Sequence, residues 1–333
     1  MSYNIPMNKL LIIDGHAIMH RAFHAIPPLS TPSGAPINAV HGLVSMLLKI
    51  IQDLKPTHIV VTFDEQAPTF RNKALPSYQS QRPPMAGELS SQFDKAKKFL
   101  EVANISYYSM PGFEADDVIG TIAQHAVQDT EILRYKDTRK GKQEKSSIEY
   151  PVSNISEVVI VTGDKDQLQL VDDKKGIKLF MPIGGLASGK LFGEKETVER
   201  MGVVPTQIAD LKALIGDPSD NYKGVAGIGP VTAIGLLTKY KSVKNIYDHL
   251  EEISPNIRAK LIADKAGADM SFMLATIVCD VPIKFNFPQM EKWNLATPEV
   301  VNLFENEFGF KTLTARIKKF GEDREKERQT SFF

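Results

Sequence analysis

Three short, continuously apolar runs constrain the fold of this 333-residue chain more than any other feature. They are Leu10 to Ile13, Ile59 to Phe63 and Val158 to Val161. Continuous apolar runs are typical of parallel strands that are buried on both faces. Helical patterns lie between them, at 40–54 and 91–103. This order predicts an α/β fold with a central, mostly parallel, doubly wound sheet.

The strand pattern fades after about residue 203, and helical patterns follow. We therefore expect an α/β domain at 8–203 and a helical domain at 204–320. The lysine-rich segment 129–156 has no periodicity, and we interpret it as a solvated insertion rather than a DNA contact. The last residues, 321–333, form a charged tail that ends in two phenylalanines.

Bulk composition excludes some classes of protein. The 40 basic and 40 acidic residues cancel, so net charge alone does not indicate a nucleic-acid binder, and only the distribution of charge could. Cys279 is the only cysteine, which excludes a disulfide within the chain and a cysteine zinc site. The polar start, 1–8, is followed by a short apolar run, so we expect no signal peptide, no membrane span and a cytoplasmic protein.

An aspartate follows each apolar run: Asp14, Asp64 and Asp164. The carboxyl ends of parallel strands lie at one edge of a sheet, so these side chains are expected to converge. A single aspartate there would most simply cap the next helix, but three equivalent positions favour a shared site. Further acids follow in PGFEADDVIG, TGDKD and GDPSD: Glu114, Asp116, Asp117, Asp166, Asp217 and Asp220.

The spacing of the later acids also favours a common site. Asp164 and Asp166 point the same way in an extended segment, whereas Asp217 and Asp220 share one face of a helix. Carboxylates this crowded repel one another unless cations bind. Oxygen ligands select Mg²⁺ or Mn²⁺, and two such ions about 4 Å apart suit hydrolysis of a phosphodiester.

The segment GVAGIGPVTA places Gly227 and Gly229 in a tight turn before a helix. The N-terminus of a helix attracts anions, although a GIG sequence alone indicates only a turn. Because it follows GDPSDN and precedes Thr232 and Lys239, we favour a hairpin that grips the duplex backbone without reading bases.

Together these motifs resemble the 5′ nuclease domain of bacterial DNA polymerase I and its flap endonuclease relatives. The matching segments run in family order from about residue 8 to 285. The resemblance implies a PIN-like, resolvase-like sheet, a helical arch at 65–100, a helix-hairpin-helix of the three-turn type, and 5′-3′ exonuclease and flap endonuclease activity in replication and repair. The segments are LLIIDGHAIMHRAFHA, STPSGAPINAVHGL, PTHIVVTFDEQAPTFRNKALPSYQSQRPPM, PGFEADDVIGTIA, VVIVTGDKDQLQLV and LIGDPSDNYKGVAGIGPVTA.

The resemblance also implies roles by matching position. Gln79 stands where relatives commonly carry a lysine; we expect its amide to donate hydrogen bonds near the scissile phosphate without supplying charge. The role of Asp117 stays open. The implied roles are a first metal at Asp14, Asp64, Glu114, Asp116 and Asp164; a second at Asp166, Asp217 and Asp220; a phosphate contact from Arg82; DNA contacts from His20, Arg21 and Tyr78; and a potassium ion at Ser219, Val225 and Ile228. Arg71 is a second basic group that we expect to be able to contact the scissile phosphate.

The tail and the rival functions complete the expectations. Gln329, Phe332 and Phe333 resemble a sliding-clamp-binding peptide, with docking on the protein's own core as the alternative. We expect DNA and a sliding clamp as partners, and we expect the protein itself to be a monomer. A non-catalytic DNA-junction binder is the alternative that Gln79 suggests, but unmetallated acids would repel DNA. A nuclease specialised for RNA is disfavoured by the duplex-gripping hairpin.

Overall fold

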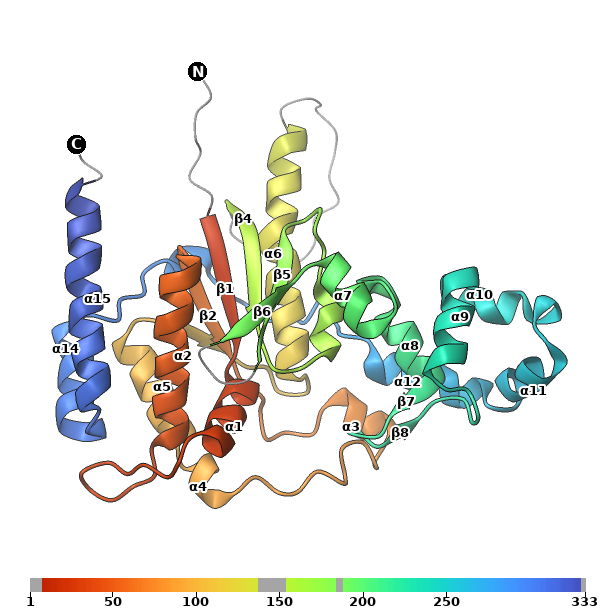
Figure 1. The fold of residues 1–333 in the computed structure, drawn as a ribbon, viewed down its shortest axis with the longest axis horizontal. Helices are drawn as coiled ribbons and strands as arrows, with labels where there is room; N and C mark the ends of the chain where they lie inside the picture. The colour runs from red at the N-terminus through yellow and green to blue at the C-terminus, as the bar shows by residue number, and fades with distance from the viewer. Residues whose placement is uncertain (1–7, 137–153, 184–187, 331–333) are drawn as a thin grey trace.

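The computed structural model describes residues 8–136, 154–183 and 188–330 (Figure 1). Its centre is a six-stranded sheet of order β3-β2-β1-β4-β5-β6, in which only β6 runs antiparallel to its neighbour. The predicted α/β class with a mostly parallel sheet is confirmed. The strands are β1 (Asn8–Asp14), β2 (His58–Thr62), β3 (Ser106–Tyr108), β4 (Ile155–Val161), β5 (Ile177–Pro182) and β6 (Gly189–Phe192).

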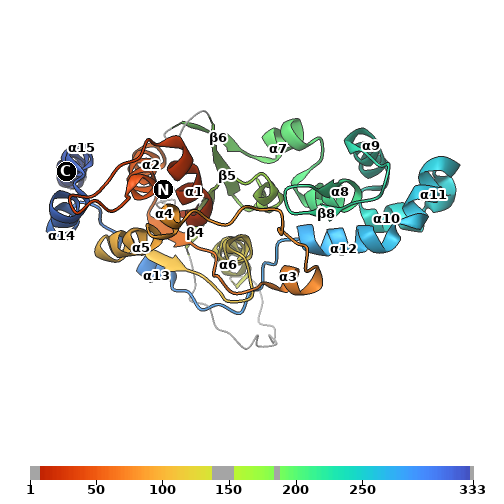
Figure 2. The same ribbon diagram turned by 90° about the horizontal axis from the view of Figure 1, so that it is seen from below.

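Helices from both ends of the chain cover one face of the sheet (Figures 1 and 2). They are α1 (Gly15–Ala25), α2 (Asn38–Leu54), α5 (Phe93–Val102), α14 (Pro298–Asn302), the π-helix η4 (Leu303–Phe308) and α15 (Lys311–Thr330). Alternate strand residues face this layer, so Leu11 and Ile13 of β1 share a core with Phe304 and Phe320. The C-terminal helices therefore complete the core that the N-terminal strands begin.

The opposite face is covered by α6 (Ala115–Lys136) and by a segment that includes α13 (Phe287–Met290). Leu10 and Ile12 pack there against Ile119 of α6. Residues 129–136 continue α6, so the expectation of a patternless insertion is wrong for them. Residues 137–153 of that segment lie outside the described part of the chain.

A second, helical region extends from the edge of the sheet that carries β5 and β6 (Figure 1). Its elements are η1 (Asp166–Leu170), α7 (Glu194–Met201), η2 (Pro205–Gln207), α8 (Ile208–Ile215), β7 (Gly216–Asp217), β8 (Tyr222–Lys223), α9 (Pro230–Tyr240), α10 (Val243–Asp248), η3 (Leu250–Glu252), α11 (Pro255–Ala263) and α12 (Lys265–Ala275). Leu214 of α8 and Leu237 of α9 share its core with Leu179 of β5. The sheet and the helical region are thus joined by apolar contacts.

Two predicted ranges differ from the structure. Residues from Trp293 to Phe320 pack in the first core, next to β1, rather than with the helical region expected at 204–320. The charged tail is helical as far as Thr330, since α15 continues past the buried Phe320.

The segment between β2 and α5 contains only two short helices, α3 (Phe70–Ala74) and α4 (Gly87–Ser90). In Figure 1 it runs beneath the sheet, between the helical region and α1. Most residues between 79 and 90 are exposed. Among the described residues, no helix has both the length and the apolar character needed to cross a membrane.

Candidate active site

The turn at the end of β1 brings the first acid to the edge of the sheet. Asp14 ends β1, and α1 begins at the next residue. A Cβ on Gly15 would lie 2.5 Å from the Phe63 ring, so the close strand-to-helix turn requires glycine there. Asp14 Oδ1 accepts a hydrogen bond from Ala17 N at 2.9 Å and caps α1. The capping role and the cluster role therefore coexist in this residue.

Gln167 joins two acids at the centre of the site. Its Nε2 donates to Asp14 Oδ2 at 3.1 Å and to Asp116 Oδ1 at 2.6 Å. Thr162, at the end of β4, donates to Asp14 Oδ2 at 2.8 Å and accepts from Asp164 N at 3.0 Å. The predicted convergence of acids from β1, β4 and α6 is thus present in the structure.

Asp64 and Glu114 complete what we call the strand-end cluster, which consists of Asp14, Asp64, Glu114, Asp116 and Asp164. Asp64 Oδ1 accepts from Ala115 N at 2.7 Å, so the first turn of α6 positions it. Its other oxygen lies 3.4 Å from His16 Nδ1. The side chain of Asp64 is 37% exposed and forms the open side of the cluster.

Burial and mutual repulsion make the strand-end cluster costly to ionise. Burial, with the nearby charges of Asp64 and Asp164, raises the pKa of Asp14 to about 7. Burial likewise raises the pKa of Glu114 to about 7, although the Arg71 charge acts against it. For the same reasons the pKa of Asp116 is raised well above its ordinary value. A bound cation would remove this penalty.

A second group, the hairpin-side cluster, contains Asp166, Asp217 and Asp220, whose ligand oxygens lie within 4.8 Å of one another. Asp166 begins η1, whereas Asp217 lies in β7. Burial raises the pKa of Asp166 to about 6. Burial also acts to raise the pKa of Asp217, but hydrogen bonds from Lys212 and Ser219 outweigh it and hold that pKa below its ordinary value.

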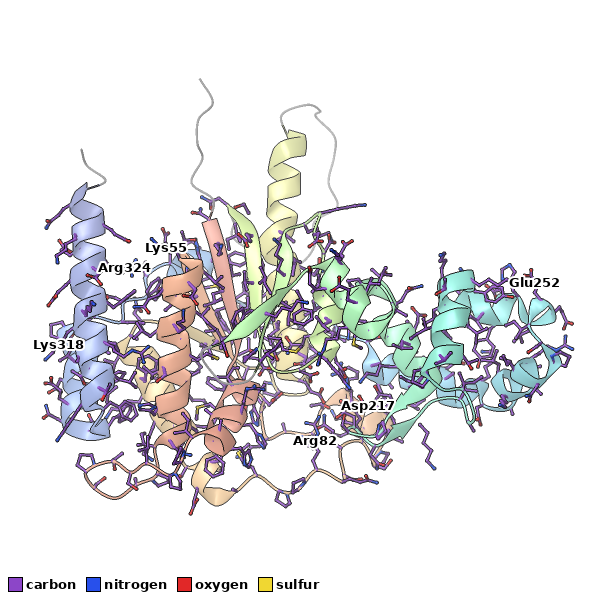
Figure 3. The ribbon with its side chains drawn as sticks, viewed as in Figure 1. Lys55, Arg82, Asp217, Glu252, Lys318 and Arg324 are labelled. Atoms are coloured by element: carbon purple, nitrogen blue, oxygen red, sulfur yellow. The ribbon has the colours of Figure 1, made fainter. Side chains whose placement is uncertain are left out.

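Two cations contact the hairpin-side cluster. Lys212 Nζ lies 2.8 Å from both carboxylate oxygens of Asp166 and also pairs with Asp217. Arg82 Nη2 lies 2.5 Å from Asp220 Oδ1. Figure 3 labels Arg82 on the segment that runs beneath the sheet and Asp217 in β7 of the helical region.

Lys212 and Gln167 were not among the site residues predicted from sequence. Lys212 is a buried lysine within the apolar segment ADLKALI, and a cation at a core position of a short helix is the signal that could have identified it, since such groups are buried only with partners. Gln167 is also buried, but it lies in the mostly polar segment DKDQLQL, which gives no comparable local signal.

The prediction that Arg71 contacts the scissile phosphate is wrong, because its guanidinium is buried and fully engaged. It is 2% exposed. Nη1 and Nη2 donate to Asp117 at 2.7 and 2.9 Å, while Nε and Nη2 donate to the carbonyls of Leu274 and Thr276. This pair also assigns Asp117, which is fully buried, a structural role. It ties α3 and α6 to the end of α12.

Tyr78 is 5% exposed and stacks on Tyr222, so the structure does not support its predicted contact with DNA. Its hydroxyl instead lies 3.4 Å from carboxylate oxygens of both Glu114 and Asp220. Gln79 follows with a left-handed backbone (φ 56°) and donates from its backbone N to the Asp220 carbonyl at 2.9 Å. Tyr78 therefore links the two clusters from the arch segment.

The predicted hairpin precedes α9. Gly229 is the N-cap of this helix, and a Cβ there would meet nothing within 4 Å, so its backbone is open to an approaching group. Thr232 lies in the first turn of α9, whereas Lys239 lies in its last turn and pairs with Glu252 at 3.5 Å. Gly227 has a φ of 75°, and its carbonyl accepts from Lys260 Nζ at 3.1 Å.

The remaining predicted residues are placed as follows. Ser219 Oγ donates to Asp217 Oδ1 at 2.5 Å, and the Val225 carbonyl accepts from Ile228 N at 3.1 Å. His20 is exposed on α1 and Arg21 is half-buried. Gln329 is exposed on α15. Phe332 and Phe333 lie outside the described residues.

Family models match two parts of the chain: the N-terminal resolvase-like domain of 5′-3′ exonucleases at residues 9–139, and their C-terminal SAM fold at residues 203–298. A 5′-3′ exonuclease of Aquifex aeolicus is 34% identical over 281 residues, which cover 84% of this chain and 85% of that protein. DNA polymerase I of Bacillus subtilis is 35% identical over 95% of this chain. The chain spans about a third of the length of such polymerases, 32% in this case.

Solved structures share the fold. T5 5′-exonuclease with bound divalent zinc ions aligns with a TM-score of 0.60 and 21% identity, covering 81% of this chain and 90% of that one. The catalytic core of Rad2 in complex with a DNA substrate aligns with a TM-score of 0.52 and 15% identity, covering 91% and 89%. The two domain matches and the exonuclease relatives show that the chain belongs to the 5′-3′ exonuclease family.

Proposed function

We propose that this protein is a structure-specific 5′ nuclease that hydrolyses DNA phosphodiesters at 5′ ends and flaps during replication and repair. The observation that carries the proposal is the convergence of eight carboxylates, from β1, β2, β4, α6 and the hairpin, on one edge of the sheet. Membership of the 5′-3′ exonuclease family supports the same reaction.

The donor set fits hard divalent cations. One carboxylate oxygen each from Asp166, Asp217 and Asp220 lies within 4.8 Å of the others, as ligands of one hard cation would. The pKa of Asp14 near 7 shows how poorly the protein alone balances the charge of the strand-end cluster. We infer a two-ion centre for Mg²⁺, with Mn²⁺ as a substitute; such ions, when bound, activate water and stabilise the phosphodiester transition state. The strand-end cluster would hold one ion and the hairpin-side cluster the other.

The chain's own groups would position the DNA. The open backbone at Gly229 and the N-terminus of α9 suit a duplex phosphate, with a potassium ion at Ser219, Val225 and Ile228 as our proposal for the turn. Arg82, whose side chain is 53% exposed, can turn from Asp220 toward a phosphate. His20 is exposed, and we propose that its ring stacks on a base.

We propose two further properties. The protein acts as a monomer in the cytoplasm, where its DNA substrates are. Gln329, Phe332 and Phe333 bind a sliding clamp. Gln329 lies near the end of α15, and in Figure 1 this helix is on the opposite side of the sheet from β7 and β8, so both sites could be used together. Deleting residues 329–333 should abolish co-elution with the cognate clamp and leave flap cleavage unchanged. Undiminished co-elution, or a lower melting temperature, would favour docking of the tail on its own core.

A panel of labelled substrates tests the main proposal: a 5′ flap, a nicked duplex, a blunt duplex and an RNA flap of the same sequence. We expect Mg²⁺-dependent cuts near the flap junction and at the nick, and slower cutting of the blunt duplex. Tight flap binding without cleavage would support the alternative, a DNA-junction-binding protein, which the uncharged Gln79 favours. Preferential cutting of the RNA flap would point to an RNA nuclease.

A further inference from the structure

We propose that Lys212 is a resident cation of the hairpin-side cluster, which holds the acids together without a metal ion and lowers their affinity for divalent ions. This inference rests on the proposed two-ion function and explains what sets the ion affinity of one of the two sites. It concerns binding of the ion, and it can be tested without DNA.

The contacts of Lys212 place a full positive charge among the candidate ligands. Its Nζ lies 2.8 Å from both oxygens of Asp166 and pairs with Asp217. With Arg82 on Asp220, three carboxylates face two cations, so the cluster has a formal charge of −1. An incoming divalent ion meets far less negative charge than the acids alone would provide.

Lys212 differs from Arg82 because its side chain cannot move away from the hairpin-side cluster into solvent. Lys212 is 4% exposed on α8, between the buried residues Leu211 and Ala213, and α8 packs against α12. Turning its ammonium away would bury an unpaired charge. Arg82 is half-exposed and can swing into water. Lys212 therefore remains in the cluster when a metal ion or DNA approaches.

The strand-end cluster lacks this arrangement. Among its described contacts the nearest arginine or lysine is Arg71, 3.3 Å from Glu114 at one edge, and no lysine lies within ion-pair distance of its five acids. The charges of Lys212 and Arg82 reach this cluster only at longer range, where they act to lower the pKa of Asp164. The two clusters should therefore bind divalent ions with different affinities, and the weaker site should be the one that contains Lys212.

Isothermal titration calorimetry of Mn²⁺ into the full-length chain, without DNA, tests the inference. Lys212→Met should tighten the weaker site by about tenfold or more, because it removes a unit charge next to the ion. In EDTA the same variant should melt at a lower temperature than wild type, and Mn²⁺ should restore it. Lys212→Arg, which keeps the charge, should bind like wild type.

Lys49→Met is the matched control, since it removes an exposed lysine that pairs with Asp53 at 2.5 Å on α2, far from the site. It should change neither ion affinity nor melting. If Lys212→Met does not fold in EDTA, Lys212→Gln, which keeps a hydrogen-bond donor without charge, replaces it. An unchanged or weaker second site in a folded uncharged variant would overturn the inference. A wild-type protein that cuts no DNA, but whose variants bind Mn²⁺ as predicted, would refute only the proposed function.

Discussion

The strand-end cluster places five carboxylates, of which only Asp64 is exposed, against a guanidinium at one edge, whereas the hairpin-side cluster surrounds its three carboxylates with Lys212 and Arg82. In the first, burial raises the pKa of Asp14 and Glu114 to about 7. In the second, Lys212 and Ser219 hold the pKa of Asp217 below its ordinary value, while burial raises the pKa of Asp166 to about 6 against the opposing charge of Lys212. The first cluster therefore depends on an external cation, and the second is partly balanced from within.

The largest effect should come from removing a ligand of the strand-end cluster. Asp116→Ala or Asp164→Ala should lower single-turnover flap cleavage by about a thousandfold or more, because both positions lie at the centre of the metal-binding acids. Circular dichroism and flap affinity should stay close to wild type, which would show that the variants lose the chemical step rather than folding or DNA binding. Mg²⁺-dependent cleavage retained in either variant would show that the acids converge for another reason.

Next in size is the contrast between two arginines. Arg71→Ala should destabilise the fold by about 3–5 kcal/mol, because Asp117 would be left buried and unpaired. Arg82→Ala removes a half-exposed ion pair and should cost no more than about 1 kcal/mol, yet slow cleavage. Urea unfolding and single-turnover rates on the same preparations separate the two roles. A stable Arg71→Ala that cleaves slowly would restore Arg71 as a phosphate contact.

A moderate effect is expected on the pH dependence of stability. The pKa of Asp14 rises from 3.8 to about 7 on folding, so the folded state binds the extra proton, and stability is lost as pH rises between these values. In EDTA the melting temperature should therefore fall more from about pH 5 to pH 8 for wild type than for Asp14→Asn. Burial lowers the pKa of His41 and His58, so these histidines make the protein more stable as pH rises. Wild type and Asp14→Asn share this contribution, so the difference between their pH dependences reports on Asp14.

Mg²⁺ supplies the control for that experiment, since it should reduce the fall for wild type by offsetting the charge of ionised Asp14. Equal slopes for wild type and Asp14→Asn in EDTA would mean that the strand-end cluster is already balanced without a cation, which contradicts the comparison drawn above.

The smallest effect should come from Gln79→Lys, which adds a charge to the arch segment beside the hairpin-side cluster. We expect similar flap affinity and single-turnover cleavage faster by up to about tenfold. Gln79→Met is the matched control without charge or donor. No gain from lysine would mean that Arg82 already supplies the charge that the phosphate needs.

The strand ends could be predicted from sequence, since their signal is local. A continuous apolar run followed by an acid defines both the strand and the edge at which Asp14 and Asp164 meet, and the observed strands overlap those runs. The two-residue spacing from Asp164 also predicted that Asp166 belongs to the site, together with Asp217 and Asp220 of the later GDPSD motif. Local pattern thus located the acids without showing how their charge is balanced.

What could not be predicted depends on contacts between distant segments. Arg71 reads as an exposed arch residue until the carbonyls of Leu274 and Thr276 and the carboxylate of Asp117 surround it. Lys212 occupies a core position of α8 only because two acids from other elements lie there. The C-terminal helices belong to the same core as β1, because Phe304 and Phe320 share that core with Leu11 and Ile13. No local sequence pattern predicts this contact between the two ends of the chain.

Cleavage of a fluorescent 5′-flap substrate with Mg²⁺ and with EDTA, at DNA concentrations that saturate binding in both, shows whether the two clusters form one metal-dependent nuclease centre. We expect a cut near the junction with Mg²⁺, none in EDTA, and measurable flap binding in both. Cleavage at the same rate in EDTA, or bound flap that the protein cuts with neither Mg²⁺ nor Mn²⁺, would contradict such a centre.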